Sequence, residues 1–238
     1  MNLLCIDIGN TNIVLGTYNQ DKLVSVDRIE TNKNKLHENI HFKNMNSIAI
    51  SSVVPEIENE IKNKLQSNYF SISHANSGIK LDVNYPNEVG NDRICNMKVA
   101  IKNNLYPAII VDFGSATTYD VINSQGHFIG GAIAPGVDVS AENLFKKAAQ
   151  LNKVNFELPK SVIGRDTVTN LQSGIMYAGI DSINGMLNRI KKEVKNEIKH
   201  IILTGGFSNI LSKHIDHNHM LDPQMTIKGI KLIWEENQ

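Results

Sequence analysis

The chain has 238 residues, 41% hydrophobic and 20% charged, so it can bury a core, and global disorder is excluded. Its 24 lysines and arginines balance its 24 aspartates and glutamates, so there is no bulk positive charge to bind nucleic acid. No stretch approaches the roughly 18 apolar residues that span a bilayer, so we expect neither nucleic acid nor a membrane as a partner.

The two cysteines and the N-terminal residues indicate the cellular compartment. Cys5 and Cys95 have no CxxC spacing, which favours a reducing cytoplasm over structural zinc. The opening MNLLCIDIGN has neither a basic segment nor a cleavage site, so we expect no signal peptide. The sequence therefore predicts a cytoplasmic protein.

The first hundred residues alternate between predicted strands and helices. Strands are expected at residues 3–8, 13–18, 23–29, 47–54 and 71–73, and helices at 56–65 and 92–105. Strand, helix and strand in succession form a parallel crossover, which predicts an α/β fold.

The pattern restarts after Pro107. Strands are expected at residues 108–113, 117–122, 127–133 and 200–203, and helices at 139–151, 170–194 and 226–236. Aligning the two halves superimposes Asp7 on Asp112 and Gly9 on Gly114, an offset of 105 residues. We therefore predict two duplicated domains, residues 1–106 and 107–238, with the last helix a candidate to pack back on the first domain.

Each half carries an Asp-x-Gly turn directly after a buried strand. Glycine lets the main chain approach a ligand, and the Ser, Thr and Asn residues that follow add donors to the backbone N–H groups. Two such turns facing a common cleft would hold a nucleoside triphosphate, with the aspartates near a hydrated cation. The sequence has neither a GxxxxGK[ST] loop nor a GxGxxG that opens a helix, so a P-loop kinase and a Rossmann dehydrogenase fit poorly.

Other segments allow two interpretations each. Asp92, in Gly90-Asn91-Asp92-Arg93, is either a helix cap or a base that accepts a hydroxyl proton. The turn at 204–208 (TGGFS) and the segment 130–136 (GGAIAPG) are either ligand-binding backbone or ordinary turns. Three glycines within the helix at 170–194 indicate a close helix contact, either internal or between two copies: Gly174, Gly179 and Gly185.

Taken together, these motifs resemble the type III pantothenate kinases, members of the actin, hexokinase and Hsp70-like phosphotransferase superfamily. The resemblance rests on DIGNTNIVLG at 7–16, GNDR at 90–93, DFGSATTYD at 112–120, GGAIAPGV at 130–137, the segment 164–179 and TGGFS at 204–208. It implies two actin-like (ribonuclease H-like) domains with a nucleotide cleft between them. The implied reaction transfers the γ-phosphate of ATP to pantothenate, the first step of coenzyme A biosynthesis.

The resemblance also implies a role for each matching position. Asp92 would accept the proton of the pantothenate hydroxyl, Asp112 would hold a monovalent cation (K⁺ or NH₄⁺), and Asp7 would contact Mg²⁺. The implied ATP contacts are Asp7, Ile8, Gly9, Asn10, Thr11, Asn12, Ile13, Val14, Gly114 and Ser115. The implied pantothenate contacts are Tyr85, Gly90, Asn91, Asp92, Arg93 and Thr167. A homodimer is also implied.

Three other functions stay open at this point. The same scaffold could phosphorylate another small alcohol, because the phosphate turns do not define the acceptor. It could be a non-catalytic regulator that keeps the nucleotide cleft, or an actin-like filament former, which would need head-to-tail interfaces.

Overall fold

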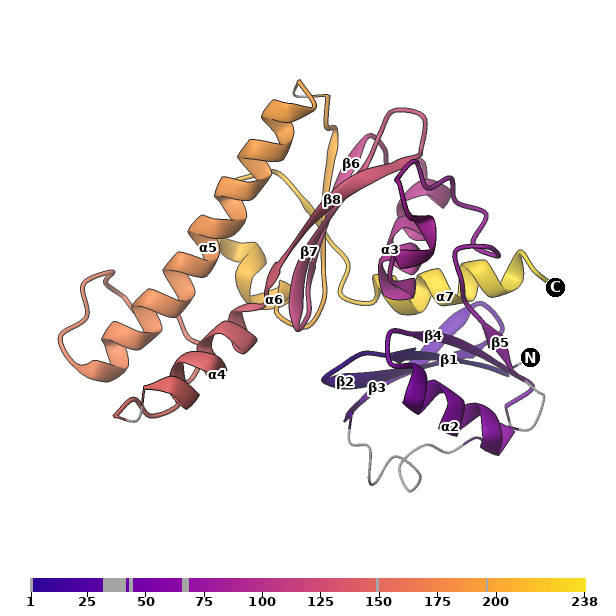
Figure 1. Ribbon diagram of the computed structural model, residues 1–238, viewed down its shortest axis with the longest axis horizontal. Coiled ribbons are helices and arrows are strands. Elements are labelled where there is room, and N and C mark those ends of the chain that lie inside the picture. The colour runs from indigo at the N-terminus through magenta and orange to yellow at the C-terminus, as the bar shows by residue number, and fades with distance from the viewer. Residues whose placement is uncertain (1, 32–41, 43–44, 66–68, 149, 196) are drawn as a thin grey trace. The chain divides into compact units, whose positions relative to one another are not determined.

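The structure is a computed structural model that describes residues 2–31, 42, 45–65, 69–148, 150–195 and 197–238 (Figure 1). The chain forms two compact units. Unit 1 comprises Met1–Leu105, Gln125–Gly130 and Gln224–Gln238, and unit 2 comprises Tyr106–Ser124 and Gly131–Pro223. Within the described ranges, no helix combines the length and the apolar character needed to cross a bilayer.

Unit 1 is built on a five-stranded sheet in the order β3-β2-β1-β4-β5. Its strands are β1 (Asn2–Ile8), β2 (Asn12–Asn19), β3 (Lys22–Glu30), β4 (Ser47–Ser52) and β5 (Phe70–Ser71). Its helices are α2 (Pro55–Leu65), the 3-10 turn η1 (Pro86–Glu88), α3 (Asn91–Lys102) and α7 (Met225–Glu235). The central strand β1 is antiparallel to β2 and parallel to β4. The C-terminal end of β1 therefore lies between the start of β2 and the end of β4.

Both faces of β1 are covered. Ile6 and Ile8 pack with Ile57 and Ile61 of α2 in one apolar cluster, and α2 has acidic residues in its first turn and basic residues in its last, as the helix dipole favours. Successive side chains of a strand point to opposite faces, so the residues of β1 between these point to the other face of the sheet. Helix α7 contacts β1, β2 and β4. Each fully buried Ile contributes about 1.5–3 kcal/mol.

Unit 2 repeats this arrangement with the order β10-β9-β6-β7-β8. The strands of this sheet are β6 (Ala108–Phe113), β7 (Ala116–Ile122), β8 (Phe128–Pro135), β9 (His200–Thr204) and β10 (Met220–Leu221). The first three residues of β8 count with unit 1. The helices of unit 2 are α4 (Val137–Lys147), α5 (Thr167–Glu193), α6 (Ser208–Leu211) and the 3-10 turn η2 (Ser212–His214). Read from the other edge, the order matches that of unit 1 strand for strand, with β6 in the place of β1 and β9 in the place of β4.

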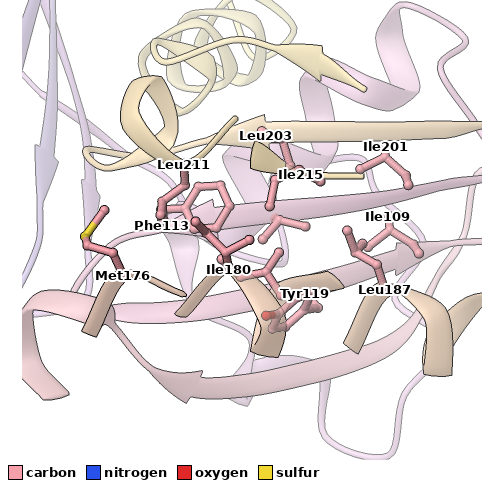
Figure 2. Packing of buried hydrophobic residues seen from close by; sticks show 12 residues of the cluster. Ile109, Phe113, Tyr119, Met176, Ile180, Leu187, Ile201, Leu203, Leu211 and Ile215 are labelled. Carbon is pink, nitrogen blue, oxygen red and sulfur yellow. The ribbon is translucent and has the colours of Figure 1, made fainter. Parts of the chain in front are cut away.

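The core of unit 2 lies between its sheet and α5. Figure 2 shows Phe113 and Tyr119 gathered with Met176, Ile180 and Leu187, and all five side chains are buried. Because side chains alternate along a strand, Asp112 lies on the opposite face from Phe113. The side chain of Asp112 therefore lies outside this core.

The α/β fold class predicted from the sequence is confirmed, while several element ends differ. The helix expected to reach residue 105 ends at Lys102, because Asn104 has a left-handed φ of 56°. The helix expected at 139–151 runs from Val137 to Lys147. Strand β10 was not predicted, since its two residues follow a polar, histidine-rich segment.

Candidate active site

The first Asp-x-Gly turn joins β1 to β2. Asp7 lies one residue before the end of β1, opposite Val14 on β2 and Ser51 on β4. The Ser51 hydroxyl donates to Asp7 Oδ1 at 3.0 Å, which orients the carboxylate at the strand end.

A tight backbone conformation closes this turn. The amide of Gly9 donates to the carbonyl of Asn12 at 3.0 Å, and a Cβ on Gly9 would lie 2.9 Å from that oxygen. Thr31 holds the turn from outside, since its hydroxyl donates to the Gly9 carbonyl at 2.8 Å. Asn10 and Thr11 are exposed at the tip, where their donors can meet a ligand.

Asp92 lies in the first turn of α3, also in unit 1. Its Oδ1 accepts from the Arg93 amide at 2.7 Å, and a Cβ on Gly90 would lie 2.6 Å from the same oxygen. Asn91 Nδ2 donates to the Ser52 carbonyl at 3.1 Å, which fixes the start of α3 to the end of β4. Burial is the largest effect on the Asp92 carboxyl and raises its pKa. The hydrogen bond from the Arg93 amide and the positive charge of Arg93 lower the pKa, but by less. A raised pKa makes the carboxylate a stronger proton acceptor.

Cys95 connects α3 to the first turn. Burial, followed by the negative charge of Asp7, raises the pKa of the Cys95 thiol. Ser51, whose hydroxyl donates to Asp7, lies beside this thiol and lowers its pKa. Sequence reasoning identified neither Ser51 nor Cys95 as part of the site. No sequence signal could have found Ser51, because its place beside Asp7 follows from the register of two parallel strands.

The second Asp-x-Gly turn lies in unit 2, in the place that the first turn has in unit 1, but it is one residue shorter: the amide of Gly114 donates to the carbonyl of Ala116 at 3.1 Å. Asp112 lies opposite Thr118 on β7 and Thr204 on β9, where Asp7 has Val14 and Ser51. The side chains of register partners share one face of a sheet, so the two threonines flank Asp112. Both hydroxyls are buried and have no hydrogen-bond partner among the described residues.

Two glycines pack against this second turn. A Cβ on Gly205 would lie 2.3 Å from Asp112 Oδ1, and Gly205 has a φ of +89°. A Cβ on Gly136 would lie 2.4 Å from the Gly114 carbonyl, and Gly136 is the N-cap of α4. The helix therefore begins directly beside Gly114 and Ser115, where its N-terminal dipole favours an anion.

Tyr85 and Thr167 lie apart from these turns in the chain. Tyr85, in unit 1, is 65% exposed just before η1. Thr167, in unit 2, opens α5, whose N-cap Asp166 accepts from the Thr169 amide at 2.8 Å. Burial and hydrogen bonding at either residue give no sign of a bound group.

Oxygen donors dominate both turns. In the described part of the chain, no group of three or more His, Cys, Asp and Glu side chains could hold a metal ion. The carboxylates and hydroxyls beside Asp7 and Asp112 suit hard cations and phosphate better than zinc.

Comparison with known proteins identifies the family. The model of the type III pantothenate kinases matches residues 3–189. The chain belongs to this family. The match contains both Asp-x-Gly turns and the GNDR segment, and it supports an ATP-dependent phosphotransferase.

Solved structures of similar fold extend over the whole chain. A Campylobacter jejuni protein provisionally described as a Baf family transcriptional activator is 22% identical, with a TM-score of 0.65 and 98% of each chain covered. A Clostridium difficile activator of 2-hydroxyisocaproyl-CoA dehydratase, with ADPNP bound, is 10% identical, with a TM-score of 0.54 and coverage of 100% and 97%. The ROK hexokinase of Thermus thermophilus is 11% identical, with a TM-score of 0.51 and both chains fully covered at 100%. At these identities the likeness shows the fold alone, which this member of the type III pantothenate kinase family shares with the three proteins.

Proposed function

We propose that this protein transfers the γ-phosphate of ATP to the primary hydroxyl of pantothenate, giving 4′-phosphopantothenate for coenzyme A synthesis. The observation that carries the proposal is the family match over residues 3–189 together with a raised-pKa carboxylate, Asp92, at the start of α3. Free, buried Cys5 and Cys95 suit the reducing cytoplasm in which we expect this activity.

The two Asp-x-Gly turns would bind ATP. Residues 7–14 offer backbone N–H groups and the exposed donors of Asn10 and Thr11. Gly114 and Ser115, beside the start of α4, would take another part of the phosphate chain.

Asp92 would act as the base. Its carboxylate would accept the proton of the pantothenate hydroxyl as the oxygen forms a bond to the γ-phosphorus and the bond to the β–γ bridging oxygen breaks, releasing ADP. Gly90, Asn91, Arg93, Tyr85 and Thr167 would bind pantothenate, with the Arg93 guanidinium pairing with its carboxylate. The Arg93 guanidinium lies 5.5 Å from the Phe128 ring centroid, a contact that restricts its position.

The cations that the family implies fit the residues present. Mg²⁺ would supply charge neutralisation on the phosphates, and the Asp7 carboxylate, oriented by Ser51, would hold it. A monovalent cation, K⁺ or NH₄⁺, would suit Asp112, because the buried hydroxyls of Thr118 and Thr204 beside it have no partner in the described structure. An unpartnered buried hydroxyl costs about 1–3 kcal/mol, which a bound cation would offset.

A test of this cation site need not rely on activity. Thr204→Val should reduce the rise in unfolding temperature that potassium gives over sodium, because ligand binding stabilises the folded state. Thr17→Val on β2, outside both turns, is the matched control and should keep the wild-type response. An unchanged response in Thr204→Val would remove Thr204 from the site.

We also propose that two copies associate through the α4–α5 face of unit 2. A cavity of about 430 Å³ opens between these helices and strands β7 and β8, with a mainly apolar lining that includes Gly174 and Gly179. Leu144 and Val168 lie 41% and 52% exposed on the same two helices. Such a face is unusual on a monomer and is what a homodimer would cover.

Light scattering can test this dimer. Leu144→Glu should shift the protein toward monomer, whereas Val24→Glu, on the exposed face of β3 in unit 1, should not. Equal masses for the two variants would exclude this face as the interface.

The decisive experiment is phosphorylation by the purified protein. Pantothenate and a panel of sugars are each supplied with Mg-ATP in potassium or in sodium buffer. Asp92→Asn should lose most turnover while ATP affinity stays near that of the wild type, and Asp27→Asn, at an exposed position of β3, should be unaffected. Turnover of a sugar alone would favour another acceptor, ATP binding without any turnover would favour a regulator, and an active Asp92→Asn would refute the base.

A further inference from the structure

The last helix of the chain, α7, lies outside the family match yet packs against the helix that carries Asp92. Its inward face consists of Met225, Ile227, Gly229, Ile230 and Ile233, all buried. At its centre a Cβ on Gly229 would lie 2.0 Å from the Cys95 carbonyl oxygen of α3. The two helices therefore touch backbone to backbone, and Gly229 is the residue that permits it.

Polar contacts fix the two ends of this helix pair. The Thr226 hydroxyl donates to Asn96 Oδ1 at 2.9 Å, and Asn96 is fully buried. Beyond the other end of α7, the Glu236 carboxylate pairs with Lys98 at 2.5 Å and with Lys102 at 3.1 Å. Since Lys98 is itself buried, this pair resists sliding of α7 along α3.

The contact point is one helical turn from the proposed base. Cys95 follows Asp92 by three residues, so its peptide group moves with Asp92 as one rigid turn of α3. The Cys95 side chain meets Ser51, and Ser51 donates to Asp7. A shift of α3 would therefore move Asp92 relative to the Asp7 turn.

We infer that α7 is a positioning element for Asp92, through the Gly229–Cys95 backbone contact and the Glu236 pairing with Lys98 and Lys102. The inference rests on the proposed function, because it assigns α7 a role in holding the base. Displacements of about 1 Å in a catalytic group can cost on the order of 100-fold in rate. Neither Gly229 nor Glu236 would touch substrate.

The main test is Gly229→Ala, with Gly185→Ala on α5 as its matched control. Both add one methyl group to a helix, but a Cβ on Gly185 would meet no heavy atom within 4 Å in the described structure. We expect Gly229→Ala to lower kcat at least tenfold, with KM for ATP within twofold, and to speed amide hydrogen exchange in the first turn of α3. Gly185→Ala should match the wild type in all three. A folded Gly229→Ala with wild-type kcat and exchange overturns the inference.

A milder variant covers the case in which Gly229→Ala fails to fold. Glu236→Gln keeps the shape of the side chain and removes its charge, and Glu235→Gln, whose partner is Lys231, is its control. We expect Glu236→Gln to lower kcat at least threefold with KM for ATP unchanged, and to speed exchange at Asp92 and Arg93. Loss of thermal stability with unchanged kcat and exchange would show a structural role only, and would overturn positioning.

The proposed function and this inference fail in different ways. If the wild-type protein phosphorylates nothing, the proposed function fails, while the exchange measurements still test whether α7 restrains the first turn of α3. If the wild type is active and both α7 variants keep its kcat, only the inference fails.

Discussion

Gly205→Ala tests the geometry of the second Asp-x-Gly turn. Gly205 has a φ of +89°, where a residue with a Cβ costs about 1–2 kcal/mol. The new Cβ would also lie 2.3 Å from Asp112 Oδ1 and 2.6 Å from the Phe113 amide nitrogen. The backbone atoms of β6 are held within the sheet and cannot shift one at a time to make room for this Cβ. The overpacking therefore costs a further loss of about 1–3 kcal/mol in the free energy of unfolding. We expect a total loss of about 2–5 kcal/mol in the free energy of unfolding.

Gly130→Ala separates the two contributions. Gly130 also has a positive φ, +118°, but a Cβ there would meet no heavy atom within 4 Å in the described structure. Urea unfolding followed by circular dichroism should therefore find Gly205→Ala less stable than Gly130→Ala by about 1–3 kcal/mol. The displaced Asp112 carboxylate should also weaken stabilisation by potassium. Equal losses in the two variants would refute the steric reasoning, and an intact potassium response would separate the cation site from this turn.

Two pH dependences follow from the carboxylates. The folded-state pKa of Asp92 is raised above its usual 3.8, so its contribution to stability is present below pH 3.8 and is lost as pH rises through the raised value. Asp92→Asn should therefore be at least as stable as the wild type in urea at pH 7, with the difference shrinking toward pH 4; a clear loss at pH 7 would contradict this. The pKa of Glu236 is lowered from 4.5, chiefly by its hydrogen bond with Lys98, so its contribution is present above pH 4.5 and is lost as pH falls through the lowered value. Glu236→Gln should be less stable than the wild type at pH 7, and the difference should shrink as the pH falls below 4.5; a difference that stays constant into the acid range would refute the assignment.

The sequence predicted the repeated strand pattern and the two Asp-x-Gly turns because these are local features. An apolar run that ends in Asp-x-Gly predicts a buried strand and a turn wherever it occurs, and the offset between Asp7 and Asp112 revealed the duplication. The matching strand orders of the two sheets confirm that interpretation of the fold. The roles of Asp92, Asp112 and the pantothenate contacts stay predictions.

What the tertiary structure decided lies between segments that are far apart in the chain. The register of parallel strands brings Ser51 beside Asp7 and Thr204 beside Asp112, and register depends on the packing of whole sheets. The Gly229–Cys95 contact joins residues separated by more than half the chain. Sequence periodicity gave α7 an apolar face, but only the folded backbone determines which helix that face meets, because many apolar surfaces would satisfy the same pattern.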